Sequence, residues 1–239
     1  MKWMSIVSLL SLSAIVVGCG GDSSDSGVSV RALNFQTVNL VDQGSSGVSD
    51  ISVNAKYKEK QEVLYSNLPL YGSSESGVML IQEKANSFDV TFDLIETNSQ
   101  QVLSTKTQTI TPSNPQIIFA LGDARSNFYD LIFQDKPDTI NPISQQISVF
   151  VMDARQLTGG SNVDVWVDGS QRSFNLSKRT LSDQIILNIN TSNIPIELIE
   201  TGANTVVASC NISTQERAFI VVFDPRDDCR IVSILDPVF

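Results

Sequence analysis

The sequence predicts an all-β protein that folds as two tandem antiparallel β-sandwich domains, and three observations support this prediction. Apolar and polar residues alternate with a period of two, most clearly over residues 88–94, which is typical of a strand with one buried face. Gly, Pro, Asn and Ser separate many such short segments, as they do in sandwich proteins. The same succession of segments occurs in both halves of the 239-residue chain.

The first sandwich is expected over residues 30–137. Its strands are predicted near residues 28–35, 48–54, 77–82, 88–94, 101–110, 116–122 and 128–133. The segment between Gln134 and Gln145 contains two prolines, and proline interrupts strand pairing. We therefore expect the boundary between the domains in this segment.

The second sandwich is expected over residues 146–239. Its strands are predicted near residues 146–153, 163–168, 183–190, 194–201, 204–210, 217–224 and 229–235. The dipeptide Asp168-Gly169 separates the apolar segment 163–167 from the segment 174–176. Because a type I′ turn needs positive φ at its central residues, this dipeptide predicts a hairpin.

Three segments of the first half recur in the second half in the same order. Residues 93–97 (DLIET) match residues 197–201 (ELIET), residues 117–123 match 219–224 in character, and residues 50–54 match 164–168. Single β-rich pentamers agree often by chance, but a preserved order of three is stronger evidence. The matches indicate that one module was duplicated.

Trp166 is the candidate ligand contact of the second domain. Val163, Val165 and Val167 alternate with Asp164 and Trp166, so the tryptophan is expected on the face opposite the valines. An exposed tryptophan can stack on a sugar or anchor a protein partner. The alternative is a tryptophan covered by the neighbouring repeat or by a loop, with a packing role only.

The N-terminus predicts a lipoprotein signal peptide at residues 1–18. The apolar run 6–17 is too short to cross a bilayer as a helix and fits a secretory signal. It ends in Val-Val-Gly-Cys19, which resembles the bacterial lipobox, so Cys19 is expected to carry fatty acyl chains such as palmitate. Residues 19–29 are then the lipidated cysteine and a flexible tether. An ordinary cleaved signal peptide is the alternative.

The lipid anchor predicts a location in the bacterial cell envelope with the membrane as a partner. Gly20 rather than aspartate follows Cys19, which favours the outer membrane and leaves the leaflet open. Cys210 and Cys229 remain, and an even pair outside the cytoplasm predicts one disulfide, the alternative being two buried thiols. A meander of the last three predicted strands would place these cysteines at opposite ends, so the bridge requires a bulge, a loop or two different sheets.

The segment Val163 to Gly169, VDVWVDG, is similar to the VDVYVNG strand and turn of the bacterial domain of unknown function 4397. The opening strand of that family resembles residues 30–35 and, more faintly, residues 149–154, although the usual histidine is missing from both copies. The resemblance covers about residues 28–235. It implies immunoglobulin-like sandwiches outside the cytoplasm and no assigned activity, so it supplies no catalytic residues.

The composition excludes several classes of chemistry. The chain contains no histidine, which removes Ser-His-Asp and Cys-His catalysis and every metal site that depends on imidazole. The sequence has no G-x-S-x-G elbow, no phosphate-binding loop ending in G-K-[ST] and no dinucleotide fingerprint. The net charge of −10 disfavours nucleic acid as a partner. We predict no enzyme activity and no cofactor.

Two groups of carboxylates are candidate sites. Asp89 and Asp93 share one face of a strand, but four residues separate them by about 13 Å, beyond the roughly 5–9.5 Å of glycosidases, so we expect a solvated face. Asp224, Asp227 and Asp228 crowd one turn and could gather calcium ligands. Asp-rich turns are common without metal, and we predict no metal site.

These observations predict a membrane-anchored envelope lipoprotein with a noncatalytic binding, adhesion or scaffolding role toward an envelope protein or a glycan. The alternative is a cell-surface carbohydrate-binding module, which requires an exposed Trp166 or a row formed by Tyr57, Tyr65 and Tyr71. A hydrolase that uses Asp and Glu alone is a third hypothesis, and it requires two carboxyl groups within about 10 Å in a cleft.

Overall fold

The computed structural model describes residues 29–42, 50–74, 77–137, 146–155, 161–188, 193–213, 217–225 and 228–234. Within these ranges the only regular elements are sixteen strands, and they form four four-stranded sheets. The described part of the chain contains no helix long and apolar enough to span a membrane. The all-β sandwich prediction is therefore confirmed.

The first eight strands form two sheets that pack face to face. Sheet A has the order β4-β1-β7-β8 and sheet B the order β3-β2-β5-β6. Leu33 and Met79 of sheet A meet Phe92 of sheet B in one core, because alternate residues of each strand point inward. The strands are β1 (Val30–Asp42), β2 (Ile51–Tyr57), β3 (Lys60–Leu68), β4 (Gly77–Gln82), β5 (Phe88–Glu96), β6 (Val102–Ile110), β7 (Gln116–Asp123) and β8 (Phe128–Asp135).

The last eight strands form a second sandwich with its own core. Sheet C has the order β12-β9-β15-β16 and sheet D the order β11-β10-β13-β14. Val149 and Phe219 of sheet C pack with Val165 and Leu198 of sheet D. The strands are β9 (Gln146–Asp153), β10 (Val163–Val167), β11 (Ser170–Leu176), β12 (Ile185–Asn188), β13 (Ile194–Glu200), β14 (Val206–Ile212), β15 (Ala218–Phe223) and β16 (Cys229–Ser233).

The two sandwiches repeat one strand plan, since adding eight to each strand number of sheets A and B gives the orders of sheets C and D. The three sequence matches fall on the equivalent pairs β5 and β13, β7 and β15, and β2 and β10. The match on β2 is shifted by two residues. With β5 and β13 aligned, Trp166 opposes Glu197 as Asn54 opposes Asp93, so Asn54, and not Ser52, is the equivalent of Trp166.

The sheets differ from the sequence prediction in three respects. Each sandwich contains one parallel pair, β1 with β7 and β9 with β15, where we expected only antiparallel pairing. Strand β3 was not predicted, and β1 continues to Asp42, well beyond the expected end at residue 35. The second half of β1 lacks the apolar pattern of a buried strand, because polar residues such as Thr37 and Asn39 are buried there. Its extension was therefore not predicted.

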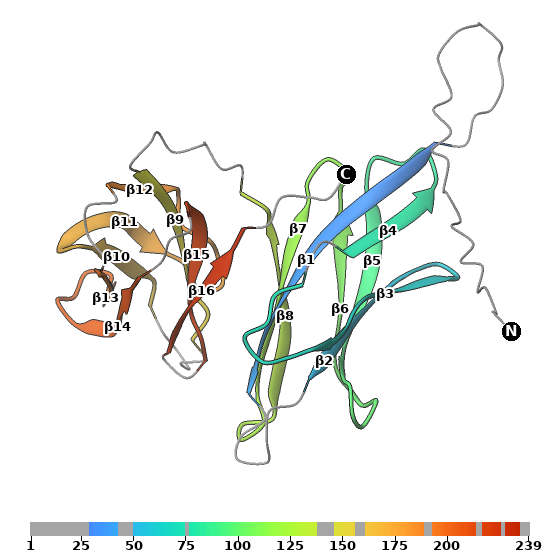
Figure 1. The fold of residues 1–239 in the computed structure, drawn as a ribbon, viewed down its shortest axis with the longest axis horizontal. Coiled ribbons are helices and arrows are strands. Elements are labelled where there is room, and N and C mark those ends of the chain that lie inside the picture. The colour runs from blue at the N-terminus through green and yellow to red at the C-terminus, as the bar shows by residue number, and fades with distance from the viewer. Residues whose placement is uncertain are drawn as a thin grey trace, which may run out of the picture.

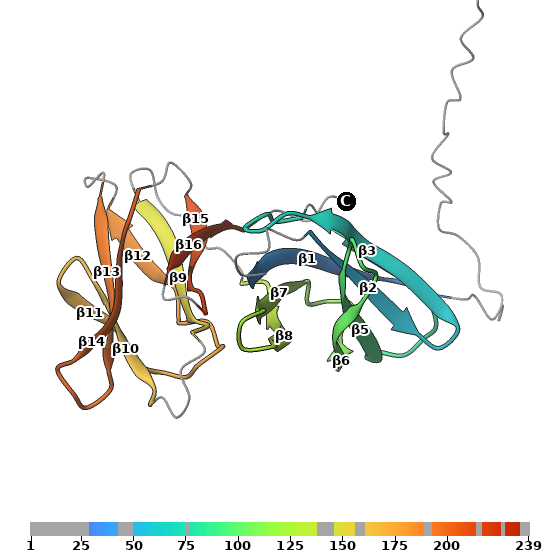
Figure 2. The same ribbon diagram turned by 90° about the horizontal axis from the view of Figure 1, so that it is seen from below.

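A third core joins the two sandwiches. Sheets A and C pack against each other through Val38, Phe119 and Ile132 on one side and Phe150 and Ile220 on the other, all almost fully buried. The molecule is consequently a stack of four layers in the order B, A, C, D (Figures 1 and 2). Strands with both faces buried carry nearly continuous apolar sequence, as residues 117–121 do.

Polar contacts also cross the junction between the sandwiches. The Gln36 side chain donates to the carbonyl of Ser233 at 2.8 Å, and the Gln134 side chain donates to the carbonyl of Arg179 at 2.9 Å. The Arg179 guanidinium lies 2.8 Å from an Asp130 carboxylate oxygen and 5.1 Å from the centre of the Phe128 ring. The contacts of Arg179 hold the loop after β11 against β8.

The predicted disulfide is present and links two sheets. Cys210 belongs to β14 in sheet D and Cys229 begins β16 in sheet C, with a Cα–Cα distance of 6.2 Å. Because the strands lie in different sheets, the geometric objection raised by a simple meander does not arise. The bridge covalently closes the second sandwich, and no disulfide is described in the first.

Candidate ligand-binding surface

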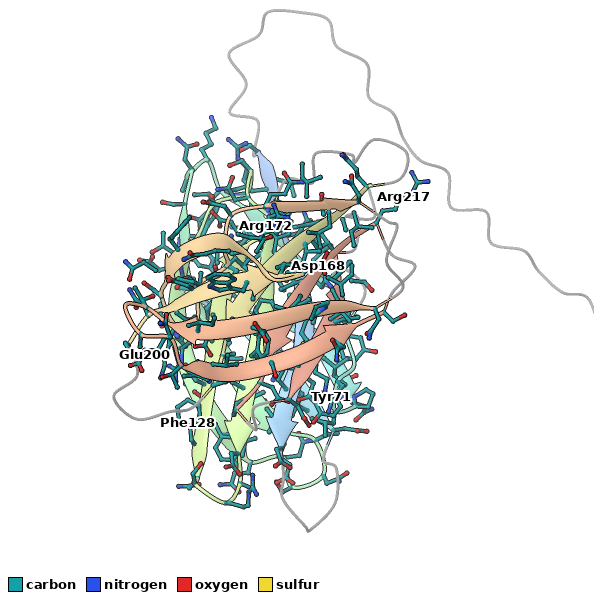
Figure 3. All side chains as sticks on the ribbon, turned by 90° about the vertical axis from the view of Figure 1, so that its left-hand side faces the viewer. Tyr71, Phe128, Asp168, Arg172, Glu200 and Arg217 are labelled. Carbon is teal, nitrogen blue, oxygen red and sulfur yellow. A yellow bond between two sulfur atoms is a disulfide. The ribbon has the colours of Figure 1, made fainter. Side chains whose placement is uncertain are left out.

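Trp166 lies on the outer face of sheet D, as the sequence predicts. Val163, Val165 and Val167 are buried in the second core, so the side chains that alternate with them point away from it. Trp166 is partly exposed there. Figure 3 views the molecule toward this sheet, which has no further layer over it.

A row of side chains crosses all four strands of sheet D at the level of Trp166. Trp166 on β10 opposes Gln171 on β11 and Glu197 on β13, and Glu197 opposes Ser209 on β14. Glu197 alternates with the buried Ile196 and Leu198, so its carboxylate stands on the same outer face. An aromatic ring, a carboxylate, an amide and a hydroxyl therefore share one row.

A hollow of about 200 Å³ lies on this face beside Glu197, the residue that opposes Trp166. It is lined by Pro195, Glu197, Ser209, Cys210 and Asn211, and Pro195 opposes Asn211 in the pairing of β13 with β14. Within the described part of the chain, the side chains of Glu197, Ser209 and Asn211 make no hydrogen bond or ion pair with protein groups. Their donors and acceptors remain available to a ligand.

Phe174 adds a second aromatic ring to the same sheet. Val163 pairs with Leu176 and Val165 with Ser173, so Phe174 and Asn175 together oppose the single outward residue Asp164. This bulge displaces Phe174 from the alternation and leaves it 72% exposed, the largest exposed fraction of any large apolar side chain described. The backbone amide of Asn175, which has a φ of 54°, donates to Asp164 Oδ1 at 2.8 Å.

The equivalent row of sheet B has a different character. Asn54 opposes Asp93, and Asp93 opposes Thr105. Asp93 accepts a hydrogen bond from Thr105 Oγ1 at 2.7 Å and forms an ion pair with Lys56. Burial alone would raise the pKa of Asp93, but the hydrogen bonds from Lys56 and Thr105 outweigh it and lower that pKa. The carboxylate of this row is thus already bound by protein groups.

The expectation of a solvated pair at Asp89 and Asp93 is therefore half wrong. Asp89 is exposed and accepts from Thr109 Oγ1 at 2.6 Å, whereas Asp93 is only 5% exposed because Lys56 and Thr105 cover it. Each carboxylate has a hydroxyl partner from β6. The pair forms part of a hydrogen-bonded strand surface.

A larger groove of about 670 Å³ lies on the first sandwich, between the turn that joins β2 to β3 and the end of β4. The Glu83 carboxylate at its rim accepts hydrogen bonds from Lys58 and, at 3.0 Å, from the Tyr57 hydroxyl. The bond from Lys58 does most to lower the pKa of Glu83, and the same bond raises the pKa of Lys58. Lys60 donates to the carbonyl of Leu80 at 2.6 Å, which blocks part of the free edge of β4.

The three tyrosines singled out in the sequence do not form a row. Tyr57 packs edge-on against Phe88 with ring centres 5.4 Å apart, and Tyr65 packs against the first core. Tyr71 lies under the guanidinium of Arg230 from the other sandwich, 3.9 Å from its ring centre. Of the two aromatic arrangements proposed for sugar binding, only the one based on Trp166 has the required position.

The remaining sequence candidates are placed only in part. Asp224 is buried, and its Oδ1 accepts the backbone N–H of Asp228 at 3.1 Å, so this turn is closed by its own hydrogen bonds. Asp227 and Cys19 lie outside the described residues. Among the residues that are described, no group of three His, Cys, Asp or Glu side chains is placed to hold a metal ion.

No protein-family model and no curated protein matches this chain. Solved structures align with it weakly. Family 41 carbohydrate-binding modules from streptococcal virulence factors, described for α-glucan recognition, share 9% sequence identity over 81% of this chain and 95% of theirs, with a TM-score of 0.26. The family 26 module of Eubacterium rectale Amy13K, solved in complex with maltoheptaose, shares 11% over 86% and 98%, with a TM-score of 0.24.

Two tandem C2 domains of extended-synaptotagmin 2 align equally well, with 11% identity over 87% of this chain and 86% of theirs and a TM-score of 0.25. Scores of this size are shared by proteins of different function.

Proposed function

We propose that the protein is a noncatalytic glycan-binding lipoprotein of the bacterial cell envelope and that the outer face of sheet D is its binding surface. The observation that carries the proposal is the row in which Trp166 stands beside Glu197 and Ser209, at the edge of a hollow. A sugar ring has an apolar C–H face and a rim of hydroxyls, so it needs an aromatic plane next to unpaired polar groups.

A binding role fits this surface better than catalysis. The row contains a single carboxylate, Glu197, and glycoside hydrolysis uses a pair. The neighbouring Asp164 already accepts bonds from the Asn175 amide and, at 2.9 Å, from Thr201 Oγ1. The chain also has no histidine to act as a general base.

The position of the tryptophan makes the proposal easy to test. Trp166 is the only tryptophan after Cys19, so the intrinsic fluorescence of the processed protein reports on this surface alone. We expect quenching or a spectral shift when the protein is titrated with a binding member of a glycan panel. Calorimetry should show that Trp166→Ala abolishes this binding, while Asn54→Ala, the equivalent change in sheet B, leaves it intact. If neither fluorescence nor calorimetry detects binding of any glycan in the panel, the glycan proposal is wrong.

The lipid anchor needs a separate test. The tether from Cys19 to Val30 would hold the sandwiches within reach of the membrane. We expect mass spectrometry of the protein from envelopes to find acyl chains on Cys19, and Cys19→Ala to release the protein from the membrane fraction. A Cys19→Ala protein that stays membrane-bound would contradict anchoring through this residue.

A further inference from the structure

The arrangement of aromatic and charged groups on sheet D bears on the length and the charge of the ligand as well as on its chemical class. Phe174, Trp166, Glu197 and Ser209 come from β11, β10, β13 and β14 in that spatial order. Neighbouring strands lie about 4.8 Å apart, so this path across the sheet is on the order of 14 Å long. A single sugar would cover only part of it.

The two rings occupy diagonal positions on adjacent strands. Phe174 lies at the level of Asp164, whereas Trp166 is two residues further along β10. Diagonal neighbours on an antiparallel pair are roughly 7–8 Å apart. They therefore offer two separate stacking planes, with the hollow at Asn211 beyond Trp166 supplying hydrogen bonds at the other end.

The charges on this face are mostly negative. Asp164 and Glu197 stand on the outer face, and Asp168 occupies the turn between β10 and β11. Arg172 on β11 is the one Lys or Arg within the four strands of sheet D (Figure 3 labels Asp168 and Arg172). The whole chain has a net charge of −10. Carboxylates within about 10 Å of a bound anion repel it at moderate ionic strength. A uronate, sialylated or phosphorylated chain is therefore a poor ligand.

We infer that the surface binds a neutral linear oligosaccharide laid across the strands of sheet D, with one sugar ring on Trp166, a second on Phe174 and the next hydroxyls hydrogen-bonded in the hollow. This inference rests on the proposed glycan-binding function and adds chain length and charge to it. Phe174 then acts as an extension of the site, and Glu197 acts as a hydrogen-bond acceptor and as a selector against anions.

The test uses the processed protein and calorimetric titration with neutral hexasaccharides of glucose, xylose or N-acetylglucosamine, their disaccharides and a hexasaccharide of galacturonate. We expect a neutral hexasaccharide to bind at least about tenfold more tightly than its disaccharide and than the galacturonate chain. Phe174→Ala should weaken the hexasaccharide by about 3- to 10-fold and leave the disaccharide unchanged. Val63→Ala, an exposed apolar residue of the equivalent edge strand β3, is the matched control and should change nothing.

A second variant tests the selection against anions. Glu197→Gln keeps the shape of the side chain and one acceptor oxygen but removes the negative charge. It should therefore narrow the preference for neutral over galacturonate chains by several-fold while circular dichroism stays unchanged. If Trp166→Ala removes binding but galacturonate binds as well as neutral chains, or Phe174→Ala has no effect, this inference fails and the proposed function stands. If no member of the panel binds, both fail.

Discussion

The two copies of the module present equivalent rows on their outer faces, and the two rows differ in the contacts of their carboxylate. In sheet B, Asp93 is held by Lys56 and Thr105, so the row is closed by protein contacts. In sheet D, the equivalent Glu197 lies between Trp166 and Ser209, and the described part of the chain offers it no hydrogen-bond or ion-pair partner. Because neither outer face contributes to a core, its residues can change without loss of the fold. The two copies share the strand plan and differ in whether protein groups occupy the carboxylate of the outer row.

The copies also differ where the parallel strands end, and this difference predicts the largest effect. In the second copy Arg155 is 2% exposed and bonded to both oxygens of Asp153, at 2.8 and 3.0 Å, and to the carbonyl of Val207. Arg155→Ala leaves the buried Asp153 unpaired and should lower the free energy of unfolding by about 3–5 kcal/mol. Urea denaturation followed by Trp166 fluorescence measures this loss.

An exposed arginine at the end of the parallel strands of the first copy serves as the control. Arg125 lies near Asp42 and Asp123, but its side chain is 67% exposed. Arg125→Ala should therefore cost less than about 1 kcal/mol. Equal losses in the two variants would contradict the distinction between a buried and a surface ion pair.

Removal of the disulfide should have the next largest effect, and it concerns the second copy alone. Cys210 and Cys229 are 19 residues apart in sequence, so the bridge restricts the unfolded chain by about 3 kcal/mol. The double variant with alanine at both positions should lose about that amount in urea denaturation. If reduction of the native protein leaves the denaturation midpoint unchanged, the bridge does not stabilise the fold.

The junction between the copies should respond more weakly to a single polar change. Arg179→Ala removes the ion pair with Asp130, 2.8 Å away, and the contact with the Phe128 ring, while the third core remains. We expect a loss of about 1 kcal/mol and a single cooperative unfolding transition. Two separate transitions in calorimetry of the variant would be the contrary result, because the apolar layer between sheets A and C would then not couple the sandwiches.

The smallest effect is the pH dependence that Asp93 gives to sheet B. Its pKa in the folded protein lies below the usual value of 3.8, so its contribution to stability is present above that value and is lost as pH falls through the folded pKa. Asp93→Asn should cost less than about 1 kcal/mol near neutral pH, and this cost should decrease as the pH falls through the folded pKa of Asp93. Denaturation curves at several pH values measure this; a constant cost across that range would contradict the assignment.

The sequence predicts the positions of the strands better than it predicts which strands pair and which sheets pack together. Alternation located most strands, and Asp168 and Gly169 have the positive φ values of 50° and 69° that the predicted turn requires. The third core was missed, although the unbroken apolar run 117–121 is the pattern of a strand buried on both faces. The register between distant strands leaves no local pattern in the sequence. The sequence alone therefore does not predict that Glu197 and Ser209 share a row with Trp166, which follows from the pairing of β10, β13 and β14.

Phe174 was missed for a different reason. Regular alternation places it on the same side as the buried Leu176, and only the bulge formed with Asn175 brings it to the outer face. Asn tolerates the left-handed conformation, which is the one local signal in the sequence for this irregularity.

Chemical-shift mapping of the ¹⁵N-labelled, processed protein with a neutral hexasaccharide tests the assignment of the binding face most directly. We predict that the indole N–H of Trp166 and the amides of β10, β13 and β14 shift progressively with ligand, while those of the equivalent strands β2, β5 and β6 stay in place. Shifts confined to sheet B or to the groove beside β4, with Trp166 unmoved, would contradict it.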